Sequence, residues 1–279
     1  MSIKVIDYRD GDASTRFAAS LKEIGFSVLS HHPVDQGLID KAYQAWEEFF
    51  RSEDKHNYPF DASKHDGYVN PSLSETAKGH TVKDIKEFFH YYKWGRCPEY
   101  LRETTQKLFE ALTALASQLL SWVEGNTPDE IKRQFSVPLR EMIENSPTTL
   151  FRLIHYPPLT GNETPGAIRA AAHEDINLLT LLTAATAKGL QVQNSEGEWI
   201  DVPCDPNWII VNTGDMLQEC TQGYYPATTH RVANPEGSAA TESRLSMPLF
   251  LHPREDIRLS ERHTANSYRL ERYGELGLD

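Results

Sequence analysis

Two side chains that can bind a metal ion, His173 and Asp175, stand two positions apart in the segment AAHEDINLL. If this segment enters a β-strand, positions i and i+2 face the same side, so these two side chains point together and Glu174 points away. A third ligand must then come from another strand, and the best candidate is His230 in YPATTHRVANP. Two histidines and one carboxylate form the facial donor set of non-haem Fe(II) oxygenases, and catalytic zinc sites use a similar set.

These three residues also have a structural interpretation. The chain contains 11 histidines, and at ordinary Asp frequency an HxD triplet then arises by chance about half the time. His173 would in that case cap a turn, and His230 would be a buried core residue. The triplet alone therefore leaves the metal site open.

The segment RLSMPLFLH, residues 244–252, adds a second kind of chemistry. Its alternation predicts a strand with Leu245 and its i+2 partners on a core face, and Arg244 and Ser246 together on the other face. A guanidinium beside a hydroxyl is a good clamp for a carboxylate. The partner of Arg244 is either a protein Asp or Glu or the carboxylate of a bound molecule.

The elements that must position these side chains change in character near residue 147. Before this point, apolar residues at three- and four-residue spacing predict three helices, and alternation predicts two short strands. After it, short apolar runs separated by Pro, Gly, Asn and Asp predict a closed double sheet. The predicted helices span residues 14–25 (with Ser14 or Thr15 as N-cap and Gly25 as stop), 35–53, 98–125 and 263–277, and the early strands span residues 4–8 and 25–32.

This pattern predicts one domain of residues 1–279. A mostly helical N-terminal region, 1–146, packs on a β core of residues 147–253, and a helical segment follows at 254–279. We find no internal repeat and no Ser/Gly-rich linker that would separate two independent domains.

The composition narrows the class of partner. A formal net charge of −12 argues against a nucleic-acid surface, which needs clustered Lys and Arg. No apolar run approaches the ~18 residues of a membrane helix, and the N-terminus does not resemble a signal peptide. Three widely spaced cysteines suit a reducing cytoplasm. We expect a cytoplasmic protein with no nucleic acid, membrane or obligate protein partner.

Several linked motifs resemble the isopenicillin N synthase-like Fe(II)/2-oxoglutarate-dependent oxygenases. They occur in the family's order as HYPP, HEDINLLTLL, GLQV, WIDVP, NTGD, HRV and RLSMPLF. The N-terminal segment LKEIGFSVLSHHPV is similar to the first module of that family. The resemblance covers residues 3–277, and a set of linked motifs is far more specific than a single HxD triplet.

The resemblance implies a mainly β fold with flanking helices, built on a double-stranded β-helix (jelly-roll) core. It implies Fe(II) bound by His173, Asp175 and His230, and a 2-oxoglutarate site in which Arg244 and Ser246 hold the distal carboxylate. Tyr156 stands where the family has a tyrosine that hydrogen-bonds the cosubstrate, and Ile154 replaces the family's asparagine. The implied cofactors are Fe(II), 2-oxoglutarate and O₂, with ascorbate as an accessory reductant.

The implied reaction is oxidation, typically hydroxylation, of a small organic substrate with release of succinate and CO₂. A 2-oxoglutarate-independent oxidase of the isopenicillin N synthase or amino-cyclopropane-carboxylate oxidase type is an alternative, in which Arg244 and Ser246 bind a substrate carboxylate. A zinc hydrolase or a non-catalytic metal-binding jelly roll is a more remote one.

The substrate is expected to contact loops over the barrel mouth. The aromatic-rich segment 65–95 and the residues Gln222, Tyr224 and Tyr225 ahead of His230 are the candidates.

Overall fold

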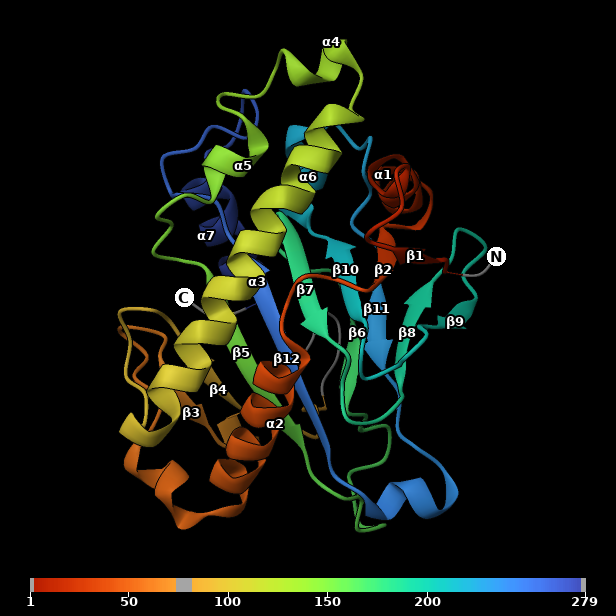
Figure 1. Ribbon diagram of the computed structural model, residues 1–279. Helices are drawn as coiled ribbons and strands as arrows, with labels where there is room; N and C mark the ends of the chain where they lie inside the picture. Colours follow the sequence, from red (N-terminus) through yellow and green to blue (C-terminus); the bar gives the residue numbers. More distant parts are fainter. Residues whose placement is uncertain (1–2, 74–81, 277–279) are drawn as a thin grey trace.

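Two facing β-sheets and a layer of helices make up the computed structural model, which describes residues 3–73 and 82–276 (Figure 1). The larger sheet has the spatial order β1-β2-β10-β7-β12-β5-β4-β3, and the smaller sheet the order β6-β11-β8-β9. The first half of the chain and the second half thus share the larger sheet, because β2 pairs with β10 and β4 pairs with β5.

The strands of the larger sheet are β1 Val5–Asp7, β2 Phe26–Ser30, β3 Gly67–Val69, β4 Glu87–Tyr91, β5 Leu150–Tyr156, β7 Leu179–Thr183, β10 Ile209–Thr213 and β12 Arg244–Leu251. Those of the smaller sheet are β6 Ala170–His173, β8 Leu190–Gln193, β9 Trp199–Asp201 and β11 His230–Val232. The two sheets form the jelly roll that the motifs implied.

Helices cover the outer face of the larger sheet, with α2 and the long α3 crossing it (Figure 1). The α-helices are α1 Ala13–Ile24, α2 Gln36–Arg51, α3 Glu99–Gly125, α4 Asp129–Lys132, α5 Leu139–Met142, α6 Asp215–Cys220 and α7 Ala265–Leu276. Short 3-10 helices are η1 Glu53–Asn57, η2 Pro71–Leu73 and η3 Gly237–Thr241. Within the described residues, none of these helices combines the length and apolar character needed to cross a membrane.

The core has two parts, separated by the larger sheet. Between that sheet and the helices lies the outer core, which includes Leu245, Met247 and Leu249 of β12. Between the two sheets lies the inner core, which includes Ile154 and Tyr156 of β5. The alternation predicted for residues 244–252 is therefore confirmed, since one face of β12 joins the outer core and Arg244 and Ser246 face the inner one.

Most predicted elements occur within one or two residues of their expected bounds, but three details differ. Helix α1 has Asp12 at its N-cap rather than Ser14 or Thr15, which lie inside the helix, while Gly25 ends it as expected. The aromatic-rich segment contains two strands, β3 and β4, whose residues are buried on both faces and so lack the alternation that marks a half-buried strand. The predicted end of the last helix, residue 277, lies outside the described residues.

The metal motif also differs from the prediction. Strand β6 ends at His173, so Asp175 follows in the connection to β7 rather than two places along the same strand. The two side chains still converge, with Nε2 of His173 3.9 Å from Oδ1 of Asp175.

Candidate metal centre

His173, Asp175 and His230 converge at one point on the inner side of the barrel. The Nε2 atoms of His173 and His230 lie 3.9 Å and 3.7 Å from Oδ1 of Asp175, and all three donor atoms lie within 4.8 Å of one another. His230 pairs directly with His173 across β11 and β6, which sets the two imidazoles side by side. Among the described residues, these three form the one group of His, Cys, Asp or Glu side chains whose donor atoms are close enough to bind a common metal ion.

Hydrogen bonds orient both imidazoles for a metal ion. Nδ1 of His173 donates to the carbonyl of Ala171 over 2.8 Å, and Nδ1 of His230 donates to the carbonyl of Thr228 over 3.0 Å. A proton held on Nδ1 leaves the Nε2 lone pair for coordination, and such second contacts fix the ring orientation. Both Nε2 atoms therefore face the carboxylate as acceptors.

The two carboxylate oxygens of Asp175 have different contacts. Its Oδ2 accepts hydrogen bonds from Thr180 Oγ1 at 2.5 Å and from Asn212 Nδ2 at 2.7 Å. Its Oδ1 is the atom that faces the two imidazoles. One oxygen thus anchors the side chain and the other remains for a metal ion, which is the arrangement expected for a coordinating carboxylate.

The charges of these groups also suit a divalent cation. Burial and then the nearby His230 lower the pKa of His173 below that of a free imidazole. Burial alone would raise the pKa of Asp175, but the two histidines and the hydrogen bonds from Asn212 and Thr180 lower it overall. A neutral imidazole and an ionised carboxylate are the forms that bind a metal ion.

Residues from the N-terminal region support His230. The ring of Phe26, on β2, packs edge-on against the His230 imidazole with 5.4 Å between ring centroids. Gly25 precedes it in the left-handed conformation, with φ of 68°, and a Cβ on Gly25 would overlap Oγ1 of Thr228. Thr228 is the residue whose carbonyl orients His230, so a glycine is required for this close approach.

Three other predicted residues lie together on the inner face of the larger sheet. Arg244 pairs in register with Tyr156, and Ser246 pairs with Ile154. The Arg244 guanidinium lies 5.0 Å from the centre of the Tyr156 ring. All three predicted cosubstrate residues, Tyr156, Arg244 and Ser246, are buried.

The sequence analysis did not identify Arg152, which lies on the same inner face of the larger sheet. Arg152 of β5 donates to Nε2 of His90 over 2.8 Å, and its guanidinium packs on the rings of Phe88 and Phe250 at 4.7 Å and 5.5 Å. Phe250 stands opposite Thr180, the residue bonded to Asp175. The alternation of β5 could have placed Arg152 beside Ile154 and Tyr156, but nothing in the sequence marks it as functional.

The candidate substrate contacts divide by strand face. Phe88 and Val69 join the inner core, whereas Tyr68 and Tyr91 join the outer core. Asn70 accepts hydrogen bonds from Ser72 in its own turn. Of the 65–95 segment, the fold therefore brings Val69 of β3 and Phe88 of β4 to the barrel interior.

The candidates ahead of His230 contact helices instead. The Tyr225 hydroxyl donates to the carbonyl of Val123 in α3, and the Tyr224 ring lies under the ammonium of Lys22, 4.3 Å from its centroid. The Gln222 side chain bonds with Gln134. Their described contacts connect the metal-binding segment to the helical layer.

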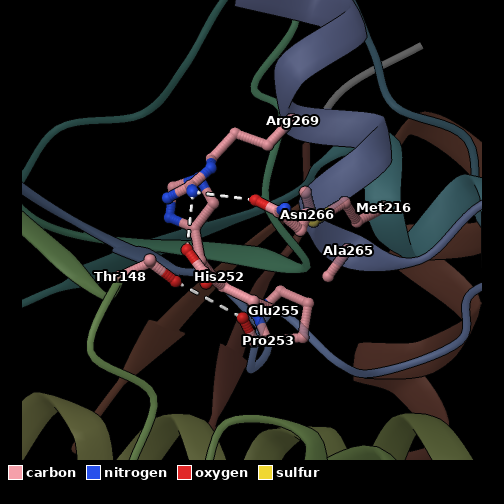
Figure 2. Close-up of a pocket in the computed structure, with 8 residues that line it drawn as sticks. All are labelled: Thr148, Met216, His252, Pro253, Glu255, Ala265, Asn266 and Arg269. Carbon is pink, nitrogen blue, oxygen red and sulfur yellow. Dashed lines mark hydrogen bonds and ion pairs between the residues drawn. The ribbon is translucent and has the colours of Figure 1, made fainter.

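Two hollows lie apart from the three converging ligands. One, with a volume of about 700 Å³, is formed by α3 and the segment 140–149 on the outside of the molecule. The other is a small hollow beside the end of β12, where His252 and Arg269 point toward each other (Figure 2). Neither hollow is lined by His173, Asp175 or His230.

Comparisons with known proteins agree with this geometry. The family model of the 2OG-Fe(II) oxygenase superfamily matches residues 147–253, and that of the non-haem dioxygenase N-terminal region, named for morphine synthesis, matches residues 3–109. A crystal structure from Shewanella oneidensis described as an oxygenase is 53% identical, covers 99% of both chains and superimposes with a TM-score of 0.90. The chain belongs to the 2OG-Fe(II) oxygenase superfamily. It resembles the isopenicillin N synthase-like branch, as its motifs implied.

More distant relatives match over nearly the whole chain. Gibberellin 2-beta-dioxygenase 3 of Arabidopsis thaliana is 26% identical over 97% of this chain and 85% of its own length. A crystal structure of a 2OG-Fe(II) oxygenase family protein from Caulobacter crescentus is 28% identical, covers 98% of both chains and has a TM-score of 0.80. Membership of the family makes this oxygenase an Fe(II)- and 2-oxoglutarate-dependent dioxygenase, with Fe(II), 2-oxoglutarate and O₂ as its cofactor and cosubstrates.

Proposed function

We propose that His173, Asp175 and His230 bind the catalytic Fe(II) of this dioxygenase. The observation that carries the proposal is the convergence of three donor atoms within 4.8 Å, each on a side chain whose other polar atom is already hydrogen-bonded. A site of two imidazoles and one carboxylate leaves positions for a cosubstrate and O₂. The lowered pKa values of His173 and Asp175 favour a neutral imidazole and an ionised carboxylate, which are the forms that bind a metal ion.

We propose that Arg244, Ser246 and Tyr156 bind 2-oxoglutarate. The Arg244 Nε atom donates to the carbonyl of Ala187 over 3.0 Å, while its buried Nη1 has no hydrogen-bond partner. A buried guanidinium nitrogen without an acceptor is costly, so a carboxylate at this place satisfies it. Ser246 and Tyr156 add hydroxyl donors on the same strand faces.

The bound iron, with 2-oxoglutarate and O₂, supplies oxidation of a substrate C–H bond coupled to decarboxylation of 2-oxoglutarate to succinate and CO₂. The protein's part is to hold the metal ligands, orient the cosubstrate and keep water away. The inner core of apolar side chains around Ile154, Leu182 and Ile210 supports the last of these tasks. The product of this chemistry on a small organic molecule is the hydroxylated substrate.

The test is succinate release from 2-oxoglutarate in the wild type and in Asp175→Ala. The variant removes the anionic ligand and should lose turnover and tight Fe(II) binding. Glu174→Ala is the matched control, because the Glu174 side chain is exposed and bonds to Thr229 instead of facing the histidines. Wild-type turnover in Asp175→Ala, or equal losses in both variants, would contradict the metal assignment.

The same assay separates this function from that of 2-oxoglutarate-independent oxidases. Substrate oxidation by the wild type should require 2-oxoglutarate and yield one succinate per product. Oxidation without 2-oxoglutarate would instead assign Arg244 and Ser246 to a substrate carboxylate.

We propose that the primary substrate is a small organic molecule bound against the inner wall formed by Phe88, Arg152 and Phe250. Phe250 pairs with Thr180, which donates a hydrogen bond to Asp175, and Arg152 packs on both Phe250 and Phe88. A substrate screen read out by succinate release tests this, with Phe88→Ala and Phe250→Ala expected to raise KM for the substrate and leave Fe(II) affinity unchanged.

We also propose that residues 1–279 act as one domain, with the N-terminal region 1–146, the core 147–253 and the segment 254–279 as its parts. Contacts between α2 and the barrel support this, since the Tyr43 hydroxyl donates to the carbonyl of Thr183 over 3.0 Å. A cytoplasmic location and the absence of membrane and obligate protein partners stay predictions. The absence of a nucleic-acid partner also stays a prediction, and the net charge of −12 supports it.

A further inference from the structure

A second arginine lies beside the proposed cosubstrate residues. Arg169, immediately before β6, is 1% exposed and places its guanidinium 6.0 Å from the centre of the Tyr156 ring. Arg244, 2% exposed, contacts the same ring from β12. Tyr156 therefore has two buried guanidinium groups around it, contributed by two different sheets.

Neither arginine has its charge balanced by the protein. Arg169 donates from Nη2 to the carbonyl of Glu242 over 2.8 Å, and its buried Nε has no hydrogen-bond partner. Arg244 donates to the carbonyl of Ala187, and its buried Nη1 is likewise without a partner. Both guanidinium groups donate to backbone carbonyls and lie over the Tyr156 ring, and among residues 3–73 and 82–276 neither forms an ion pair with a carboxylate.

This arrangement is unfavourable in the protein alone. Burial and then the like charge of Arg244 lower the pKa of Arg169. Two buried positive charges with unsatisfied nitrogens are stabilised when an anion binds between or beside them. The chain as a whole carries a net charge of −12, so the two neighbouring cations Arg169 and Arg244 are opposite in sign to the protein's net charge.

We propose that Arg169 is a positioning residue for the cosubstrate, and that its charge, added to that of Arg244, makes the site selective for a 2-oxo acid with a second carboxylate. The inference rests on the proposed 2-oxoglutarate site. Arg244 contacts the distal carboxylate, and Arg169 adds positive potential there and holds Tyr156 from the other sheet. The loop that contains Glu242 is held by the same guanidinium.

The experiment compares two ligands of equal chain length, 2-oxoglutarate and 2-oxopentanoate, which lacks the distal carboxylate. Binding is measured by calorimetry on the Fe(II)-loaded protein without oxygen. In Arg169→Gln the ratio of the two Kd values should fall by about tenfold, equivalent to about 1.4 kcal/mol. Arg169→Lys, which keeps the charge, should retain the ratio within about twofold.

Arg231→Gln is the matched control, because Arg231 lies on the outer face of β11, packed on Trp199 and bonded to Gln191. A purely structural role for Arg169 would weaken both ligands alike and leave the ratio unchanged, and this result would overturn the inference. If Arg169→Gln does not fold, a tenfold loss of selectivity in Arg169→Lys would overturn it instead.

The two proposals fail in distinguishable ways. Absence of 2-oxoglutarate binding to the wild type would reject the proposed cosubstrate site as a whole. Normal binding in the wild type, with selectivity lost in Arg244→Gln but kept in Arg169→Gln, would reject the role of Arg169 alone.

Discussion

Asn212 and Thr180 lie directly opposite each other on β10 and β7, and both donate a hydrogen bond to Oδ2 of Asp175. Two neighbouring strands of the larger sheet thus fix the one carboxylate of the metal site, which itself lies in a loop.

We predict that Asn212→Leu and Thr180→Val each weaken Fe(II) binding by about tenfold to hundredfold, because a ligand without its supporting bonds is less well oriented. Anaerobic metal titration measures this. Thr183→Val is the control on the same strand, since Thr183 faces the helices and bonds with Tyr43. Equal metal affinities in all three variants would contradict the role of the two donors.

Gly25→Ala should destabilise the protein and disturb His230. A non-glycine residue is strained at φ of 68°, and its Cβ would also lie 2.7 Å from the carbonyl oxygen of Pro226. We expect a loss of at least about 1 kcal/mol in the free energy of unfolding, together with weaker Fe(II) binding.

Gly11→Ala is the comparison for this change, because a Cβ on Gly11 would meet no atom within 4 Å. Urea denaturation and metal titration give the two readouts. If Gly25→Ala binds Fe(II) as tightly as Gly11→Ala does, the close approach of Gly25 to Thr228 does not position His230.

His252 should make stability depend on pH. Burial and then the nearby Arg269 lower the pKa of His252 to about 4, and its Nδ1 is buried without a partner (Figure 2). The unfolded chain, with a histidine pKa near ~6.5, then binds more protons between these two values. Folding stability contributed by neutral His252 is complete above pH ~6.5 and falls as the pH drops toward 4.

Replacing His252 by Asn removes this titration. We expect the loss of unfolding free energy between pH 7 and pH 5 to be smaller in the variant by about 2 kcal/mol. Urea denaturation at both pH values measures the difference, and an identical pH dependence in wild type and variant would contradict it.

Glu87, an acidic group, should also make stability depend on pH. Its buried carboxylate accepts hydrogen bonds from His155 at 2.7 Å, from Lys55 at 3.1 Å and from Tyr68. Burial alone would raise the pKa of Glu87, but these donors lower it overall. The stabilisation is therefore present above the unfolded pKa of ~4.5 and is lost as the pH falls through the folded value.

Glu87→Gln should cost about 3 kcal/mol at pH 7, because it leaves Lys55 and His155 partly buried without their anion. The difference from wild type should shrink below pH ~4.5. Glu103→Gln, at an exposed ion pair with Lys107, is the control and should leave stability nearly unchanged. A cost for Glu87→Gln that stays constant from pH 7 to pH 3 would contradict the assignment.

The sequence alone predicted the four longer helices, most strands and the residues of the proposed site, but not the short helices α4, α5 and α6. Periodicity located α2, α3 and β12, since each presents one face to a core and its spacing records that face. The alternation in β12 also placed Arg244 and Ser246 on the inner side. The convergence of His173 with His230 followed from the linked motifs rather than from any local pattern.

Other features depended on tertiary structure. Strand β4 is buried on both faces, so its sequence carries no period of two. The position of Asp175 in a loop depends on the bonds from Thr180 and Asn212, which come from strand positions five and 37 residues further along the chain. Arg169 precedes a strand like many surface arginines, and only the packing against Tyr156 reveals its uncompensated charge.

The place of β12 has a consequence for synthesis. This strand lies between β7 and β5. Until β12 is synthesised, the strand groups β1-β2-β10-β7 and β5-β4-β3 are therefore not hydrogen-bonded to each other. A nascent chain therefore keeps two open strand edges until residue 251 has left the ribosome, and unpaired edges are templates for aggregation. The last strand of the larger sheet to be synthesised is thus also the one that closes both edges.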